Sequence, residues 1–292
     1  MRLRWLASHS LSGLHAAAAL VRGEELADSQ LAEALAGPAA ELQQEILAAN
    51  LPADRFWRMA CALATTFDNN RQLAKMAAYR TLGHASPNEL SVRIGGRISD
   101  VEAALLRVKP HVVEELALRR GPLREQWEAR GPGLLSRIFA LTDTKLMVDA
   151  ADIVLVLPAL GGGGEAQLQN NSVRIEAVLT HPHPQLPETV RLGWMLSQLH
   201  LDLPHYSEAM QIDRLPHVAA LAMLPATLAA AEQVELASFN DEMVRLAIDA
   251  WQVRTLGAAD PVDVVMRWWE AYAEARPPFE VAFKALDEML EQ

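Results

Sequence analysis

The feature that most constrains this fold is a change of hydrophobic pattern near the middle of the chain. Most of the sequence places apolar residues at helical spacing, whereas Ile153–Leu157 is a continuous β-branched and aliphatic run. Such a run is typical of a strand buried on both faces. Val173–Leu179 begins with alternating apolar and polar residues, which predicts a half-exposed or edge strand. The chain is therefore predicted to be an α+β protein, predominantly helical, with a small β-sheet or hairpin around residues 153–179.

Four consecutive glycines, Gly161, Gly162, Gly163 and Gly164, lie between the two predicted strands. Glycine accepts positive φ values and lets another backbone or a ligand come close. One interpretation is a structural loop that joins the strands, and the others are an anion cradle or a flap over a ligand. A hairpin is the simplest pairing of the two strands, although a parallel pairing stays open.

The glycine run does not match the motifs of nucleotide-binding proteins. A P-loop requires a Lys-Ser/Thr pair after its glycines, and residues 165–172 supply none. A dinucleotide-binding fold requires a helix directly after the glycines, so that the helix N-terminus faces the pyrophosphate. A second strand is predicted there instead. The sequence therefore predicts no cofactor.

Residues 1–86 are predicted to form an N-terminal helical region, and residues 87–292 a helical region that contains the β element. The boundary falls at Gly83–Pro87, a segment that ends one helical pattern before the next begins. The two regions could also form one compact unit. Asp28 and Asp54 are predicted N-caps, and Asp68–Asn70 is predicted to cap the helix that follows it.

Glycine and proline pairs predict several breaks between helices. Gly37-Pro38 and Leu51-Pro52 divide the first region, and Gly95-Gly96 interrupts a longer helical pattern. Gly121-Pro122 is predicted to start a new helix, and Gly131–Gly133 to end it. These positions predict short helices rather than long ones.

Composition excludes several classes of protein. The chain has 292 residues and a formal charge of −11, whereas binding to nucleic-acid phosphates requires a basic surface. A single cysteine, Cys61, excludes an intrachain disulfide and is predicted to be a small buried hydrophobe. Polar residues interrupt the N-terminal apolar stretch, and no segment approaches the roughly 20 apolar residues that span a bilayer. We expect a soluble cytoplasmic protein with no nucleic-acid partner and no membrane partner.

The densest group of charged side chains with functional potential lies between residues 119 and 130. Arg120, Arg124 and Glu128 follow one another at four-residue spacing, so they share one face of a helix. One interpretation is a solvated helix with a weak Arg124–Glu128 ion pair. The other is an arginine fork that binds a carboxylate or a phosphate.

Metal and nucleophilic chemistry have little support. His181, His183, His200 and His205 could act as zinc ligands, but the helical His-Glu-x-x-His arrangement is absent, and no metal site is predicted. No Gly-x-Ser-x-Gly elbow is present either. Catalytic residues are therefore left unassigned.

Two segments carry a resemblance to known proteins. Pro122–Leu135 and Asn170–Val178, together with the glycine run between them, resemble an uncharacterised bacterial protein family. That resemblance implies no activity, cofactor or site residue. The predicted order of helix, strand, edge strand and helix over residues 122–201 is also similar to zincin metallopeptidases. Because the His-Glu-x-x-His motif is missing, this second likeness implies a fold only.

Two functions follow from these patterns. The first is a non-catalytic cytoplasmic binding or scaffold protein, whose partner is another protein or a small anionic ligand. The alternative is a hydrolase-like enzyme, with a pocket beneath Gly161–Gly164 and a fold that is zincin-like without the metal motif. In that enzyme, Arg120, Arg124 and Glu128 would bind an anionic group, and Glu176 or His181 would handle protons.

Overall fold

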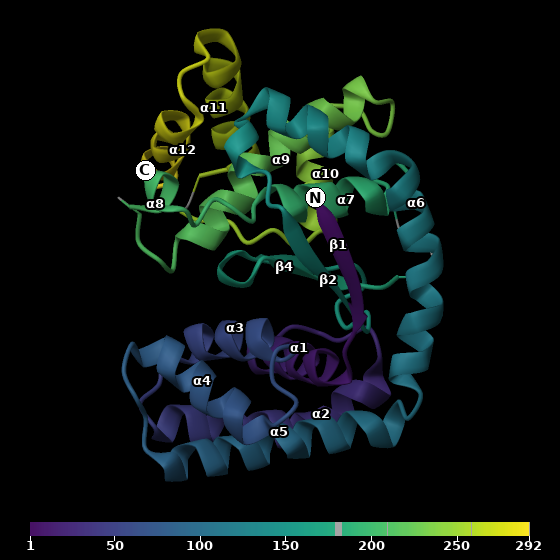
Figure 1. Ribbon diagram of the computed structural model, residues 1–292, viewed down its shortest axis with the longest axis vertical. Coiled ribbons are helices and arrows are strands. Elements are labelled where there is room, and N and C mark those ends of the chain that lie inside the picture. Colours follow the sequence, from purple (N-terminus) through teal and green to yellow (C-terminus); the bar gives the residue numbers. More distant parts are fainter. Residues whose placement is uncertain (179–182, 209, 258, 292) are drawn as a thin grey trace.

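A small mixed sheet lies between two groups of helices (Figure 1). The computed structural model describes residues 1–178, 183–208, 210–257 and 259–291. Within these residues the protein is predominantly helical α+β, with twelve α-helices and four strands. This confirms the fold class and the β element that the sequence predicts around residues 153–179.

The sheet combines parallel and antiparallel pairing. Its strands are β1 (Arg2–Ala7), β2 (Ala150–Val156), β3 (Gly164–Gln167) and β4 (Ser172–Glu176). The strand order is β1-β2-β4-β3, with β1, β2 and β4 parallel and β3 antiparallel to β4. Because the parallel strands share a direction, their carboxyl ends meet at one edge of the sheet. That edge faces helices α1–α5 (Figure 1).

The simplest predicted arrangement, a hairpin of residues 153–157 with residues 173–179, is wrong. β2 pairs with β4 in parallel, with Val156 opposite Glu176. The glycine run leads instead into β3, which forms the hairpin with β4. The strand β1 falls in a region predicted to be helical, and it pairs with β2 from Arg2 opposite Ala150 to Ala7 opposite Leu155.

The N-terminal helices form the group on the carboxyl side of the sheet. They are α1 (His9–Val21), α2 (Ser29–Ala48), α3 (Ala53–Leu63), α4 (Asn70–Leu82) and α5 (Asn88–Val108). α5 begins just after the predicted boundary between residues 86 and 87, and it packs against α2 and α4. The division of the chain into 1–86 and 87–292 stays a prediction.

The predicted capping residues are confirmed in two places and wrong in one. Asp28 accepts hydrogen bonds from the backbone N–H groups of residues 30 and 31 at the start of α2. Asn69, within the predicted Asp68–Asn70 segment, caps α4 in the same way. Asp54 lies inside the first turn of α3, whose N-cap position is Pro52.

Four predicted breaks lie inside continuous helices. α2 contains Gly37-Pro38 and α5 contains Gly95-Gly96. α6 (Val112–Leu141) contains both Pro122 and Pro132 and runs along one edge of the molecule (Figure 1). Proline removes one helical hydrogen bond, but an apolar face buried against neighbouring elements can outweigh that cost. In α6, the buried residues at helical spacing include Leu116, Leu123, Trp127, Leu134 and Ile138.

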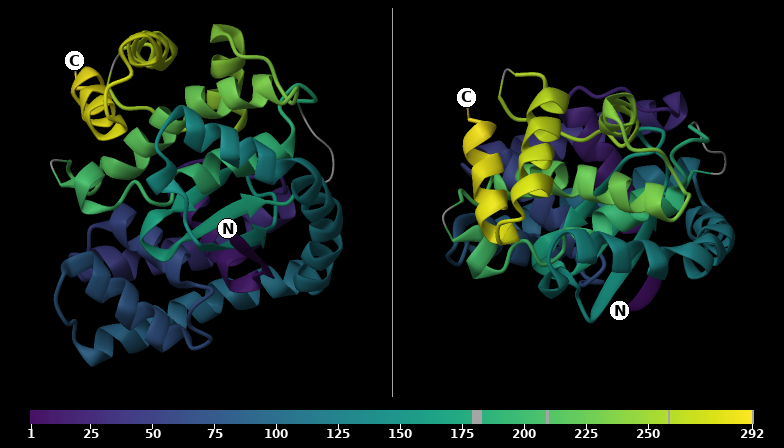
Figure 2. Two further views of the ribbon diagram at one scale, coloured as in Figure 1. Left: turned by 45° about the horizontal axis from the view of Figure 1, so that its top comes forward. Right: turned by 90° about the horizontal axis from the view of Figure 1, so that it is seen from above.

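The C-terminal helices cover the other side of the sheet. They are α7 (Glu188–Ser197), α8 (Pro204–Ser207), α9 (Leu215–Gln233), α10 (Asp241–Ala250), α11 (Pro261–Ala275) and α12 (Phe279–Met289). Two short 3₁₀-helices, η1 (Thr144–Leu146) and η2 (Leu168–Asn170), flank the strands. Figure 2 shows α11 and α12, in yellow, at the end of the molecule opposite the N-terminal helices.

α9 is the one helix among the described residues that is long and apolar enough to cross a membrane. It continues through Pro225, although proline in a helix interior removes a backbone hydrogen bond. In the protein, 72% of its apolar window is buried, as expected of a core helix. It packs against α6 and α7.

Candidate ligand-binding site

The glycine run is an anion cradle, and its anion is a side chain of the same protein. The backbone N–H groups of Leu160, Gly162 and Gly163 donate hydrogen bonds to the Glu176 carboxylate, at 2.8, 2.7 and 3.1 Å. Gly161 and Gly162 have φ values of 84° and 144°, in the region that favours glycine. The loop therefore binds the last residue of β4 and leaves these donors no room for a phosphate.

His15 completes the surroundings of this carboxylate. Its Nε2–H donates to Glu176 Oε1 at 2.6 Å, and its Nδ1 accepts a hydrogen bond from Arg174. Because arginine can only donate, the ring is the neutral tautomer with its proton on Nε2. Burial, with Arg174 next in importance, lowers the pKa of His15 and keeps the ring neutral. Both ring nitrogens are thus used inside the protein.

Glu176 carries its negative charge in a nearly closed position. Only 1% of the surface of Glu176 is exposed. Burial alone raises the pKa of this carboxyl, but the hydrogen bonds from His15, Gly162 and Leu160 outweigh that effect and set the pKa at about 2. The predicted half-exposed or edge strand at residues 173–179 is therefore wrong, since every residue of β4 is buried and β4 lies between β2 and β3.

Arg191 fixes the glycine loop from the opposite side. It lies on α7 and is 1% exposed. Its guanidinium donates to the carbonyl oxygens of Gly162, of Gly163 at 3.0 Å and of Glu176 at 2.9 Å, and it forms an ion pair with Glu188. Both the N–H and the C=O groups of the loop are therefore held by buried partners.

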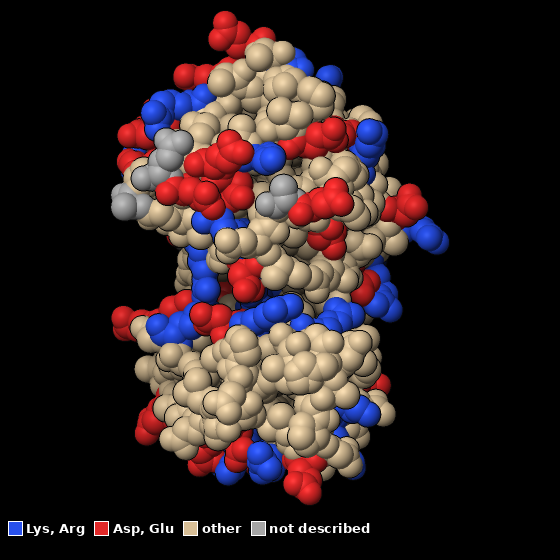
Figure 3. All heavy atoms as spheres, turned by 90° about the vertical axis from the view of Figure 1, so that its left-hand side faces the viewer, with Lys and Arg blue, Asp and Glu red and all other residues tan. Residues whose placement is uncertain are grey.

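A cavity of about 510 Å³ lies next to this closed centre, between the N-terminal helices and the β3–β4 edge. α1, α3, the glycine loop, β3, β4, α7, α9 and the segment after α10 all contribute to its wall. Figure 3 shows the molecule hollowed between its lower and upper halves, with arginine and lysine side chains along the hollow. A volume between about 300 and 1,000 Å³ is usual for a small-molecule site.

Four arginines among the described residues line this cavity: Arg22, Arg58, Arg174 and Arg254. Arg174 forms an ion pair with Glu165 at 2.8 Å, directly across the β3–β4 ladder. Arg22 and Arg254 share one carboxylate, Glu24, at 2.8 and 3.6 Å. Two guanidinium groups therefore compete for a single acidic partner.

The arginines give the cavity a positive electrostatic potential at Glu165 and His217. Partial burial raises the pKa of Glu165, but Arg174, Arg58, Arg254 and Arg22 together lower it below its usual value. Burial, then Arg58 and Arg254, lowers the pKa of His217. Two further acidic residues of the wall, Glu25 and Asp54, are exposed.

Cys61 also faces the cavity from α3, and its burial confirms the prediction of a small buried residue. Burial raises the pKa of the thiol to about 11. At neutral pH the group is therefore a thiol and not a thiolate, the form that nucleophilic chemistry requires.

A smaller recess of about 70 Å³ adjoins the cavity and shares Arg58, Glu165, Ala166 and Pro216 with it. Gln167 lies in its wall. Over the described part of the chain, two buried nitrogens beside these spaces, Arg174 Nε and Gln167 Nε2, have no hydrogen-bond partner. Two N–H donors on β3 and β4 next to the cavity therefore have no acceptor among the described residues.

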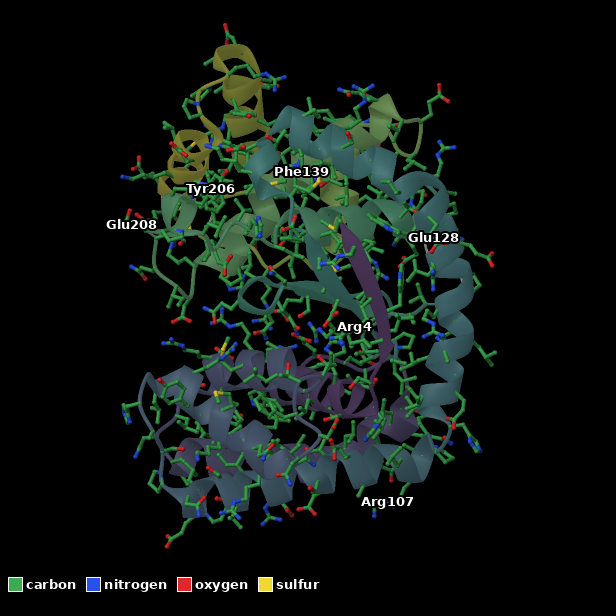
Figure 4. The ribbon with its side chains drawn as sticks, in the orientation of Figure 1. Arg4, Arg107, Glu128, Phe139, Tyr206 and Glu208 are labelled. Atoms are coloured by element: carbon green, nitrogen blue, oxygen red, sulfur yellow. The ribbon has the colours of Figure 1, made fainter. Side chains whose placement is uncertain are left out.

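The structure brings some of the predicted site residues together and separates the others. Glu176 and the glycine run form one centre, and Gly163 and Gly164 also touch the cavity. Arg120, Arg124 and Glu128 lie on α6 and are not among the described residues of the cavity wall. Figure 4 places Glu128 on α6 at the edge of the molecule.

The Arg124–Glu128 ion pair itself is present, at 2.7 Å, between side chains that are 55% and 57% exposed. This is the solvated helix of the first interpretation. The predicted arginine fork is not assembled with Glu176.

The histidines give no metal centre in the part of the chain that the structure describes. Within it, no group of three or more His, Cys, Asp and Glu residues could hold a metal ion. His200 Nδ1 lies 3.1 Å from the carbonyl oxygen of Lys145, and the His205 ring lies against Tyr206. His181, named above as a possible proton carrier, lies outside the described residues.

Several residues of the site were not predicted from the sequence, notably His15, Arg58 and Arg191. Two of them left a signal. His15 interrupts an apolar run from Leu11 to Ala19, and Arg191 stands between the apolar residues of α7. A charged or polar residue on the buried face of a helix requires partners inside the protein.

No protein-family model, no curated protein and no solved structure matches this chain.

Proposed function

We propose that the protein binds a small organic anion in the cavity beside β3 and β4 and does not alter it chemically. The observation that carries this proposal is the convergence of Arg22, Arg58, Arg174 and Arg254 on a cavity in which Glu165 is part-buried. Guanidinium groups bind carboxylates and phosphates through charge-assisted hydrogen bonds. A ligand anion would add to the partners that these arginines now have, which are Glu24, Glu165 and, for Arg58, Asp213 at 2.7 Å.

The chemistry of the neighbouring groups favours binding over catalysis. His15 uses both ring nitrogens inside the protein, so it keeps no position from which to exchange a proton with a ligand. The Cys61 thiol is neutral at pH 7 because its pKa is about 11. The glycine loop is held by Glu176 and Arg191 and provides no unused N–H group at Gly162 or Gly163.

Calorimetric titration with matched pairs of small molecules tests the proposal. Succinate is compared with succinamide, and glucose 6-phosphate with glucose, so that each pair differs mainly in charge. We expect an anion of the set to bind and its uncharged partner not to bind. The affinity should fall as salt rises, because the exposed arginines are screened.

Arginine variants locate the binding. Arg254→Gln and Arg58→Gln should each weaken binding of the anion about 10-fold, the effect of losing a charge-assisted hydrogen bond. Arg124→Gln, which removes the same charge from exposed α6, is the matched control and should leave the affinity unchanged. Equal weakening in all three variants, or equal binding of charged and uncharged partners, would contradict the proposal.

The hydrolase-like enzyme remains the second hypothesis, because the cavity does reach Gly163 and Gly164. The two functions differ in the fate of the ligand. Mass spectrometry of the bound molecule after prolonged incubation would recover it unchanged from a binding protein. Steady conversion to a product would support the enzyme instead.

A further inference from the structure

The cavity has an aromatic side as well as a cationic one. Of the seven tryptophans in the chain, three are found in the described cavity wall: Trp57, Trp194 and Trp251. They come from α3, from α7 and from the residue that ends α10. Elements far apart in the sequence thus bring indole rings to one space.

The polar edges of two of these rings are already bonded within the protein. Trp57 Nε1 donates to Gln43 Oε1 at 2.7 Å, and Trp194 Nε1 donates to the Ala220 carbonyl oxygen at 2.8 Å. Trp57 is 4% exposed and Trp194 is 3% exposed, so what these two rings offer the cavity is a small part of their carbon surface. Trp194 and Trp251 stack on each other, with centroids 5.1 Å apart and planes inclined by 28°, which makes a stiff aromatic wall.

We propose that the ligand is an aromatic anion, a molecule whose planar ring carries a carboxylate or a phosphate group. This inference rests on the proposed function and adds that the apolar part of the ligand is a planar aromatic ring. The arginines around Glu165 would bind the acidic group. The indoles would contact the ring, since aromatic pairs gain stability beyond the area that they bury.

The decisive comparison uses two acids with the same carbon skeleton and charge. 2-Naphthoate is planar, whereas decahydro-2-naphthoate is saturated and puckered. Calorimetric titration at pH 7 should show 2-naphthoate binding about 10-fold more tightly. 2-Naphthyl phosphate forms a third arm, and its affinity relative to 2-naphthoate shows which acidic group the arginines prefer.

Equal binding of the two acids, or tighter binding of the saturated one, overturns the aromatic inference and leaves the proposed function standing. Failure of all three naphthalene-type probes, when succinate or glucose 6-phosphate binds, has the same meaning. Failure of every anion tested overturns both.

A variant tests whether the preference comes from the cavity wall. Trp57→Leu should lower the ratio of the two affinities, with Trp194 and Trp251 still in place, whereas Trp57→Phe should keep the ratio near that of the unchanged protein. The ratio is measured within one variant, so a loss of stability does not imitate the effect. Trp5→Leu, on β1 and outside the described cavity wall, is the control and should keep the full ratio. An unchanged ratio in Trp57→Leu would overturn the contact with Trp57.

Discussion

Two carboxylates on neighbouring strands, Glu176 and Glu165, have opposite surroundings. Glu176 ends β4, is 1% exposed and is bound by backbone N–H groups and His15. Glu165 lies on β3 opposite Arg174, its side chain is 34% exposed, and its partners are arginine side chains at the cavity. One carboxylate is enclosed in the fold, and the other faces a space that a ligand can enter.

This difference separates a structural charge from a functional one. Backbone donors in a loop fixed by Arg191 cannot turn toward a new partner. Guanidinium groups at the end of long side chains can change partner when an anion enters. A lowered pKa is found at both glutamates, so the kind of partner and its access to the cavity are what distinguish the sites.

The largest expected effect is on stability, from Glu176→Gln. The glutamine would place an uncharged amide against N–H donors and leave His15 with a weaker partner, so the free energy of unfolding should fall by about 3–5 kcal/mol. Urea denaturation measures it. Glu165→Gln, the matched change at the open carboxylate, should cost about 1 kcal/mol or less. Equal losses in the two variants would remove the distinction between the sites.

Acid should destabilise the protein chiefly through the enclosed centre. The Glu176 pKa is about 2 in the folded protein against an ordinary value of 4.5, so its stabilisation is complete above pH 4.5 and is lost as the pH falls toward 2. That difference corresponds to roughly 3 kcal/mol.

His15 acts in the same direction at higher pH. Its folded pKa is lowered from 6.5, so the unfolded chain takes up the proton first and stability declines as the pH falls below 6.5. Urea denaturation at several pH values between 7 and 3 follows both effects. In a plot of unfolding free energy against pH, Glu176→Gln should flatten the part of the curve below pH 4.5. An unchanged slope in that range would contradict the prediction.

A smaller effect is expected at the glycine cradle. Gly162→Ala places a Cβ atom on a residue with φ of 144°, which should cost about 1–3 kcal/mol. Gly96→Ala is the control, because Gly96 lies in α5 with open space around it, and alanine should stabilise that helix by up to about 1 kcal/mol. Thermal unfolding of the two variants should therefore shift in opposite directions. Equal shifts would show that the loop does not require its backbone conformation.

The smallest effect is expected at the exposed ion pair. Arg124→Gln should change the free energy of unfolding by no more than about 0.5 kcal/mol, because both partners are more than half exposed. A double-mutant cycle with Glu128→Gln measures the pair alone. A coupling energy well above 1 kcal/mol would contradict this prediction, because it would mean that the exposed pair stabilises the fold substantially.

Local patterns in the sequence predicted the local parts of the fold. The β2 run, the Asp28 cap and the helix that ends at Gly83 depend on residues close in the chain, and all three are confirmed. The strand β1 and the proline-containing helix α6 were not predicted, because their stability comes from distant packing. Arg2 pairs with Ala150, and only the folded chain brings them together.

Distance along the chain also decided which residues of the site could be predicted. The glycine run and Glu176 were selected from the sequence because glycines and a strand carboxylate are visible in one segment. His15 lies 161 residues from Glu176, and Arg174 lies 159 residues from His15. Arginines at the predicted helix were conspicuous because they are close together in sequence, whereas the four at the cavity come from four separate segments.

The pairing of β1 with β2 also has a consequence for synthesis of the chain. Arg4 and Asp152, which form an ion pair across this ladder, are 148 residues apart. At about 5–20 residues per second, the ribosome needs roughly 7–30 s to deliver the partner of the first strand. Helices α1–α5 can form in that interval, but the sheet cannot. We therefore expect the first seven residues to wait unpaired until late in translation, and a deletion of them to expose the edge of β2 to other chains.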